Sequence, residues 1–361
     1  LIRRGAQVQF VVSSAAFGFV GEQALEFGSG KKVISRLTGK SEHVKLFGKN
    51  GKAGLFLIAP ATANTISKIA MGIDDTSITT LASIAIGSKK PVLIAPAMHE
   101  PMYEHPIVQE NLKKLESMQR VRVIAPFLSE EKAKMQTLEE IVLEVERALT
   151  KPSLAGKKVV IASGANVEEV DPTKFFSTKS SGKTGIELAK EAFRRGAQVT
   201  IIHNTDSVAA PIITKKVSSF SEFSQRTLEE LSSADLFLCP AALSDFSVKK
   251  SEKKIKSDKS FSLEFTPNEK FLEVVRKKFP RLVVVGFKAE TNVNEKELEK
   301  IAKESLKKNN LDLIVANDVQ KNPIGLDENS VLIVGSKKTV KASGKKELIA
   351  QKIFDECKDF F

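Results

Sequence analysis

The sequence predicts an α/β protein built from two doubly wound domains. Short apolar runs alternate with helical patterns along the whole chain, and its 361 residues are enough for two sizeable cores. Near the middle, a stretch with a Pro, a Ser and a Gly (Thr150 to Lys158) interrupts this alternation and predicts a linker. We therefore expect one domain over residues 1–150 and a second over residues 155–361.

In the first half, the predicted strands are AQVQFVV, AGLFLIAP, KPVLIAPAM and VRVIAP. Each is continuously apolar, which is typical of strands buried in a parallel sheet. The segment TLEEIVLEVERALT predicts a closing helix. The first residues, LIRRGAQVQFVV, are typical of the end of a helix followed by a strand. We therefore expect a preceding strand and loop that this sequence does not contain.

In the second half, the predicted strands are KVVIAS, QVTIIHN, ADLFLCPA, RLVVVGF, LDLIVAND and SVLIVGS. The predicted helices between and after them are GIELAKEAFRRG, FSQRTLEELSS, NEKFLEVVRKKF, EKELEKIAKESLKK and KKELIAQKIFDEC. The lysine-rich stretch from Val248 to Ser260 predicts an exposed, mobile loop.

The net charge of +12 and the pI near 9.4 raise the hypothesis of a nucleic-acid partner. Against this, the lysines are interspersed with acidic residues, and the chain has no Trp and a single Tyr for stacking on bases. Small phosphorylated substrates suit the charge equally well, so we expect no nucleic acid. The sequence has no long apolar run that predicts a membrane span, and two cysteines favour a reducing cytoplasm.

The stretch FSTKSSGKTGIEL ends in Gly-Lys-Thr and raises the question of a phosphate-binding P-loop. Such a loop needs a Gly where Ser177 stands, and it needs a strand directly before it, whereas the predicted strand ends near Ser163. We therefore reject the P-loop. Two interpretations stay open: Ser180, Ser181 and Gly182 form an anion site at a helix N-terminus, or they are an ordinary serine N-cap.

Eight motifs resemble one family in the right order. SEHVKL, APATANTISKIAMGIDDTSITT and APAMHEPMY resemble a flavin-dependent decarboxylase. GANVEEVDPTKFFSTKSSGKTG, CPAALSDFSV, KKIKS, VVGFKAET and NNLDLIVANDV resemble a ligase. Together they are similar to the bifunctional phosphopantothenoylcysteine decarboxylase / phosphopantothenate–cysteine ligase, and the stretch EEKAKM is similar to archaeal members.

The resemblance implies two steps of coenzyme A synthesis. The ligase activates the carboxylate of 4'-phosphopantothenate with CTP and Mg²⁺, and cysteine's amine displaces CMP from the acyl-cytidylate. The decarboxylase uses FMN to oxidise the cysteinyl thiol, CO₂ is lost, and reduced FMN returns the electrons. The resemblance also implies a homo-oligomer, with trimers through the first domain and dimers through the second. It identifies no metal ligand.

In the ligase half, Lys254 and Lys256 would clamp the triphosphate, although they are also two of many lysines in a charged loop. Phe287 would pack on the nucleotide, with core packing as the alternative. Asp245 would read the base or hold a metal, with a helix cap as the alternative. The other expected binding residues are Ser180, Ser181, Gly182, Ala241, Ala242, Lys288, Asn317 and Asp318.

The ligase half departs from the family pattern at two positions. Thr178 stands where an Asn that handles the acyl-cytidylate is usual, and Asn166 stands where a Thr is common. A hydroxyl forms fewer hydrogen bonds than an amide. We expect Thr178 to take the catalytic position, with a turnover that Thr178→Asn would raise if the threonine is a handicap.

In the decarboxylase half, His43 matches the catalytic base and His99 stands where an Asn normally binds the substrate carboxylate. The usual flap with its proton-donating Cys is replaced by APFLSEEKAKM, so another acid or water must supply that proton. The alternative hypothesis is a ligase whose first domain binds flavin but is impaired in decarboxylation. The expected cofactor-binding residues are Ser13, Thr62, Ala63, Asn64, Thr79 and Met98.

Overall fold

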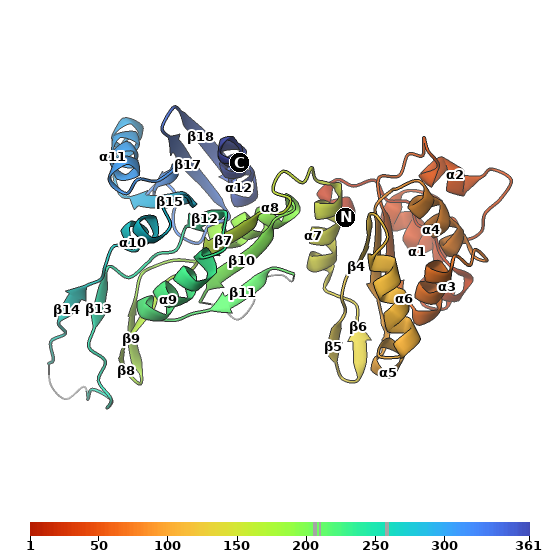
Figure 1. The fold of residues 1–361 in the computed structure, drawn as a ribbon, viewed down its shortest axis with the longest axis horizontal. Helices are drawn as coiled ribbons and strands as arrows, with labels where there is room; N and C mark the ends of the chain where they lie inside the picture. The colour runs from red at the N-terminus through yellow and green to blue at the C-terminus, as the bar shows by residue number, and fades with distance from the viewer. Residues whose placement is uncertain (205–207, 209–210, 257–259) are drawn as a thin grey trace. The chain divides into compact units, whose positions relative to one another are not determined.

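The computed structural model describes residues 1–204, 208, 211–256 and 260–361 (Figure 1). The chain divides into unit 1, Leu1–Thr150, and unit 2, Lys151–Phe361. Both units are α/β, with helices packed on parallel strands, which confirms the predicted fold class.

Unit 1 is built on a parallel sheet in the order β1 (Phe56–Ala61), β2 (Val92–Pro96) and β4 (Val121–Val123). One core joins β1 and β2 to the helices α3 (Ala63–Met71), α4 (Ser77–Gly87) and α6 (Pro106–Glu116). A second core places α7 (Leu138–Leu149) against Leu93, Ala95 and Ile124. The sheet therefore has helices on both faces, and its strand ends carry the loops of interest.

The prediction of a first strand at AQVQFVV is wrong. Val11 forms a single bridge with Ile34, and residues 6 and 7 are exposed. An apolar run becomes a strand only where a neighbour pairs with it along its length, and here the partner is one residue. Around it lie the short helices η1 (Ile2–Arg4), η2 (Ser14–Gly18), α1 (Glu22–Ser29) and α2 (Glu42–Phe47).

The stretch that replaces the flap forms a β-hairpin. Its strands are β5 (Phe127–Ser129) and β6 (Lys132–Lys134), and β6 also pairs with β3 (Met98–His99), which precedes α5 (Glu100–Tyr103). Glu130 and Glu131 form the turn with left-handed φ angles of 53° and 56°. The Glu131 carbonyl accepts a hydrogen bond of 2.9 Å from the Glu100 amide, which ties the turn to the chain after His99.

Unit 2 contains an eight-stranded sheet whose last two strands are antiparallel and whose other neighbours pair in parallel. Every strand predicted in this half is present; β11 and β18 were not predicted. The order is β11 (Ile213–Lys216), β10 (Gln198–His203), β7 (Lys158–Ala162), β12 (Leu236–Cys239), β15 (Val283–Glu290), β16 (Leu313–Asp318), β17 (Glu328–Gly335) and β18 (Thr339–Lys345).

The helices of unit 2 cover both faces of this sheet. One large core joins a face to α9 (Phe220–Leu231), α10 (Phe271–Lys278) and α11 (Glu295–Lys308). On the opposite face, α8 (Lys183–Arg194) and α12 (Lys346–Cys357) pack on each other, and η3 (Lys358–Phe360) ends the chain (Figure 1). In the sheet, β10 lies on one side of β7, and β12, which follows it in the chain, lies on the other side of β7. Such a reversal opens a crevice at the carboxyl ends of the strands.

Two hairpins that the sequence did not predict extend from unit 2 (Figure 1). They are β8 (Val167–Asp171) with β9 (Lys174–Ser177), and β13 (Phe246–Val248) with β14 (Phe265–Pro267). Phe176 and Phe265 join them through ring centroids 5.2 Å apart. The lysine-rich stretch lies between β13 and β14, and its residues 257–259 are outside the described residues.

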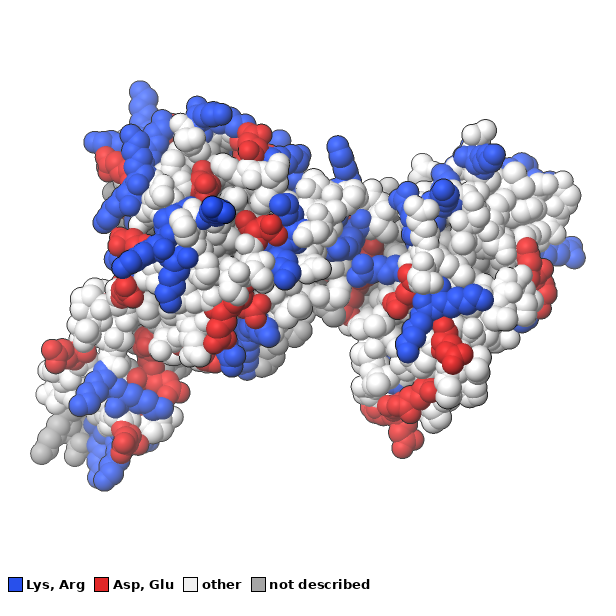
Figure 2. Space-filling view, viewed as in Figure 1, with Lys and Arg blue, Asp and Glu red and all other residues white. Residues whose placement is uncertain are grey.

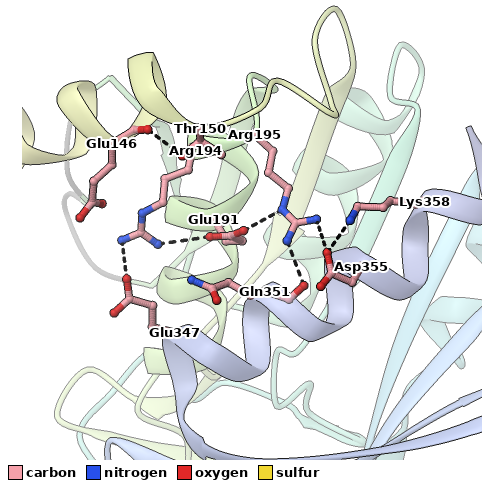
Figure 3. Close-up of polar contacts among 9 residues, drawn as sticks. All are labelled: Glu146, Thr150, Glu191, Arg194, Arg195, Glu347, Gln351, Asp355 and Lys358. Carbon is pink, nitrogen blue, oxygen red and sulfur yellow. Dashed lines mark hydrogen bonds and ion pairs between the residues drawn. The ribbon is translucent and has the colours of Figure 1, made fainter. Parts of the chain in front are cut away.

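A buried network of charges ties the C-terminal part of α8 to α12 (Figure 3). Arg195 contacts Glu191 at 2.7 Å and Asp355 at 3.0 Å, and Arg194 contacts Glu347 at 3.1 Å. The side chains of Glu191, Arg194 and Arg195 are almost fully buried. Because removing one partner would leave a buried charge uncompensated, this network holds the two helices in one arrangement.

The N-terminal end of α8 approaches the ends of β7 and β10 very closely. A Cβ atom on Gly185 would lie 2.1 Å from Ser163 Oγ, and one on Gly182 would lie 2.4 Å from His203 Nε2. Ser163 Oγ donates a 2.9 Å hydrogen bond to the Gly182 carbonyl. The glycines of SSGKTG are therefore needed for helix–sheet contact.

We predict that Gly185→Ala destabilises unit 2 by about 1–3 kcal/mol, because α8 must move away from Ser163 to make room for a methyl group. Denaturant unfolding measures the loss. The double variant Ser163→Gly/Gly185→Ala removes the obstructing atoms and should regain part of it. An unchanged unfolding midpoint for Gly185→Ala would contradict this packing.

Candidate active site

A cavity of about 190 Å³ lies where the strands of unit 2 end. Its wall brings together eight of the expected ligase residues, from four separate parts of the chain: Ser180, Ser181, Gly182, Ala241, Ala242, Phe287, Lys288 and Asn317. The carboxyl ends of adjacent parallel strands converge, which explains why residues so far apart in sequence meet here. The wall also contains Lys179, Thr184 and Asn322–Gly325, together with Lys346 and Ile349 of α12.

The start of α8 forms one wall of the cavity without a side-chain cap. Its N-cap is Gly182 with φ 69°, and no side chain among the described residues accepts a hydrogen bond from the first turn. Ser180 Oγ instead accepts a 3.3 Å bond from the Gly182 amide. The interpretation as a serine N-cap is therefore wrong. The amides of the first turn are left for an anion or water.

Two lysines hold the segment that follows β16 against this wall. Lys183 Nζ donates to the Gly325 carbonyl and to Asp327 Oδ1, each at 2.7 Å, and the bond to Asp327 lowers the pKa of that carboxyl. Lys346 Nζ donates to the Leu326 carbonyl. Burial lowers the pKa of Lys346, and Lys183 adds repulsion. Lys179 and Lys288 also line the cavity, and Lys288 pairs with Glu290 at 3.0 Å, so carboxylates balance part of this positive charge.

Sequence reasoning missed Lys346 and the loop 322–325. The loop follows a predicted strand, so the strand-end rule could have identified it. No local signal marks Lys346, because α12 reaches the cavity only after the chain has turned back through β17 and β18.

The two aspartates expected in the ligase site have other partners. Asp318 is buried, and its carboxylate accepts hydrogen bonds from the amides of Gln320 at 2.9 Å and Val293 at 3.3 Å, which lower its pKa. It fixes neighbouring loops instead of lining the cavity. Asp245 is exposed and contacts Lys270 Nζ at 2.7 Å, also outside the cavity wall. Neither aspartate lines the cavity, and their expected binding roles stay predictions.

Lys254 and Lys256 are exposed and do not line the cavity. The backbone between them is anchored to the first hairpin of unit 2. The Ile255 amide donates to Asp171 Oδ2 at 3.0 Å, and its carbonyl accepts from Lys174 Nζ at 3.0 Å. The basic motif is thus attached to the turn of β8 and β9 in this structure.

Thr178 does not line the cavity but contacts its wall. Its Oγ1 donates a 2.9 Å hydrogen bond to the carbonyl of Ala242, which is a wall residue. The backbone amide of Asn166 donates to the same carbonyl at 3.4 Å. The two positions that depart from the family pattern therefore meet at one atom.

In unit 1, the expected residues cluster at the ends of β1 and β2, where the Ala97 amide donates to the Ala61 carbonyl at 3.0 Å. Thr62 is the N-cap of α3; Ala63 and Asn64 follow in its first turn. Met98 packs against the core of unit 1. Exposed His99 lies on β3 opposite Lys132 of β6. Cross-strand neighbours share one face of a sheet.

His43 lies on α2 and is half-buried, and its Nδ1 is buried with no hydrogen-bond partner among the described residues. Ser13 is the half-buried N-cap of η2. Thr79 is 2% exposed, and its hydroxyl forms a capping box with Thr76 at the start of α4. Thr79 therefore holds the start of α4, and its expected role in cofactor binding stays a prediction.

Within the described ranges, no group of three or more His, Cys, Asp or Glu side chains could hold a metal ion. No helix in that part of the chain is long and apolar enough to cross a membrane. On the face drawn in Figure 2, Lys and Arg are interspersed with Asp and Glu.

Comparison with known proteins places similarity along the whole chain. Residues 1–150 match the Flavoprotein family, and residues 154–360 match the C-terminal domain of DNA/pantothenate metabolism flavoproteins. The chain is 42% identical over 363 residues to the coenzyme A biosynthesis bifunctional protein CoaBC of Thermococcus kodakarensis, covering 99% of this chain and 89% of that protein. It is 36% identical over 361 residues to the CoaBC of Methanocaldococcus jannaschii, covering 99% and 88%.

Among solved structures, the chain is similar to the DNA/pantothenate metabolism flavoprotein from Streptococcus pneumoniae. The TM-score is 0.52 and the identity 21%, covering 57% of this chain and all of that one. At this identity the likeness concerns the fold alone.

Proposed function

The chain belongs to the family of bifunctional coenzyme A biosynthesis proteins, and from that premise we propose which unit performs which step. Residues 155–361, within unit 2, are the phosphopantothenate–cysteine ligase, and residues 1–150 are the FMN-dependent phosphopantothenoylcysteine decarboxylase. The observation that carries the assignment is the lysine-lined cavity of unit 2 with its uncapped helix. We place both activities in a reducing cytoplasm, which the free thiols of Cys239 and Cys357 suit.

The cavity supports a reaction between anions. A carboxylate is a poor electrophile, so its oxygen must first bond to the α-phosphorus of CTP while pyrophosphate leaves with the electron pair of the broken bond. Lys288 and Lys346, with the amides at the start of α8, would stabilise the phosphates. Mg²⁺ would arrive with the triphosphate, since this cation usually binds through phosphates and few protein carboxylates.

The second step joins the activated acyl group to cysteine. The amine forms a C–N bond, the C–O bond to the nucleotide breaks, and CMP leaves with its electron pair. Phe287 and the small residues Ala241 and Ala242 leave room for the nucleotide beside the reacting carbon.

We predict that the full chain releases pyrophosphate from CTP in the presence of Mg²⁺, 4'-phosphopantothenate and cysteine, and that ATP is a poorer substrate. Lys346→Met should raise the KM for CTP roughly 10–100-fold, because a buried charged hydrogen-bond donor is lost. Lys345→Met changes an exposed neighbour and is the matched control. Absence of pyrophosphate with both nucleotides would contradict the ligase assignment.

The residues present in unit 1 fit a flavin and its substrate. The loop after β1 enters α3 at Thr62, whose side chain caps the Thr65 amide, so a phosphate would meet the amides of Ala63 and Asn64. Nδ1 of His43, which has no partner within the described part of the chain, is a buried polar atom that a ligand would satisfy. FMN, when bound, supplies the two-electron oxidation and the later return of those electrons. His43 would accept the proton released in that oxidation.

We predict that the full chain binds FMN, giving a yellow protein, and releases CO₂ from 4'-phosphopantothenoylcysteine. His43→Asn should abolish CO₂ release while leaving the flavin spectrum in place, because the base is lost but the flavin loops are not. His105→Asn is the control, since His105 is an exposed cap of α6 and Asn is also a good cap. A flavin-loaded wild type without CO₂ release would instead support the decarboxylation-impaired alternative.

We also propose a homo-oligomer, with dimers through the hairpins of unit 2 and trimers through unit 1. Four phenylalanines of the hairpin region (Phe175, Phe246, Phe261 and Phe265) are exposed, as are Phe19 and Phe27 of unit 1 at more than nine-tenths. Aromatic surface of this kind favours association.

Phe175→Asp/Phe246→Asp should lower the mass measured by light scattering. A wild-type monomer at micromolar concentration would contradict the proposal.

A further inference from the structure

One wall of the cavity in unit 2 is the loop that joins β16 to β17, whose residues 322–325 line the cavity. The base of this loop is firmly held, because Asn322 Nδ2 donates to the Asp318 carbonyl at 3.0 Å and to the Ser330 carbonyl at 3.4 Å. Beyond this base, residues 323–327 are exposed except for the half-buried glycine among them. The loop therefore has a fixed base and an exposed tip.

Two lysines hold the tip, residues 323–327, against the starts of α8 and α12. Lys183 Nζ donates to the Gly325 carbonyl and to Asp327 Oδ1, each at 2.7 Å. Lys346 adds one bond from its Nζ and a second bond of 2.9 Å, from its backbone amide to the Asp327 carbonyl. Within the part of the chain that the structure describes, no other hydrogen bond reaches the tip from outside it.

The cavity is small for its proposed occupants while the tip stays in this place. Its volume of about 190 Å³ is below the roughly 300–1,000 Å³ typical of small-molecule sites, and a ligase must bring a nucleotide and a carboxylate together. The strand ends are paired within the sheet, and glycine contacts and the arginine network fix α8 and α12. The tip of the loop is therefore the wall that can move.

We propose that residues 323–327 form a gate through which the nucleotide enters and leaves the cavity, and that the ion pair of Lys183 with Asp327 is its latch. The proposal rests on the ligase function proposed above. Lys183 is then a positioning residue that acts through the loop, since it does not line the cavity itself. The ammonium of Lys346 has three N–H donors, so it can bind a phosphate while it still holds the gate closed over the nucleotide.

A latch and a phosphate ligand predict different kinetics for Lys183→Met. Because the gate must open for entry and for exit, a weaker latch should raise the association rate and the dissociation rate of CTP alike, each roughly 3–10-fold, with little change in Kd. Loss of a phosphate ligand would instead weaken Kd, with association no faster than in the wild type. That second result would overturn the proposal.

Both rates can be measured with a tryptophan placed on the gate. The chain has no Trp, so Leu326→Trp gives a single reporter at an exposed residue of the tip, and stopped-flow fluorescence follows CTP with Mg²⁺. All variants carry this reporter. Lys338→Met is the control, because it breaks an ion pair of the same length (2.7 Å to Glu356) that does not line the cavity. It should leave both rates unchanged.

Asp327→Asn separates the latch from the general effect of charge. Removing a negative charge near the cavity would by itself speed the association of an anion and slow its dissociation. A weakened latch speeds both rates, and this is the result that we expect. Slower dissociation from Asp327→Asn, or unchanged rates in both this variant and Lys183→Met, would contradict the gate.

The backbone amide of Lys346 reports on the latch without any nucleotide. It is the first amide of α12 and has no partner within the helix, so its protection comes from the Asp327 carbonyl. Hydrogen exchange at this amide should be roughly 3–10-fold faster in Lys183→Met, and unchanged exchange would refute the latch. Pyrophosphate release by the wild type tests the ligase separately: its absence, together with faster exchange in the variant, would refute the ligase and support the latch.

Discussion

The close docking of α8 on the sheet of unit 2 is the constraint on which the rest of that unit depends. Gly182 and Gly185 allow the helix to reach Ser163 and His203, and burial lowers the pKa of His203, which favours its neutral form in this contact. At its other end, Arg194 and Arg195 lock α8 to α12 (Figure 3). A helix fixed at both ends presents its uncapped first turn at a defined place beside the strand ends.

This constraint also explains how charge is organised around the cavity. Lys183 follows directly from Gly182, and Lys346 begins the helix that the arginine network fixes. Both lysines contact the segment from Gly325 to Asp327, so a single arrangement of two helices positions two cations and a loop. The site that we propose for anionic substrates therefore depends on helix packing, and among the described residues no Asp or Glu lines its wall.

Much of this architecture follows from sequence, for identifiable reasons. Continuous apolar runs such as ADLFLCPA mark buried parallel strands, and their ends converge by topology alone, which is why Ala241, Phe287 and Asn317 share one cavity. The rule that an apolar run is a buried strand failed for AQVQFVV, because its apolar residues have a single bridge in place of a partner strand. Polar strands such as TVKASGK carry no such signal, so β18 and its consequence, the placement of Lys346, could not be predicted. For Asp318 the sequence could not show the backbone hydrogen bonds that its carboxylate accepts, because a strand-end carboxylate can hold either a ligand or its own loops.

The most direct test of this account is a crystal structure of the full chain with a non-hydrolysable CTP analogue and 4'-phosphopantothenate. We expect density for the phosphates between the start of α8 and the ends of β15 and β16, within reach of Lys288 and Lys346. Nucleotide density that lies elsewhere on unit 2, with this cavity holding water alone, would contradict it.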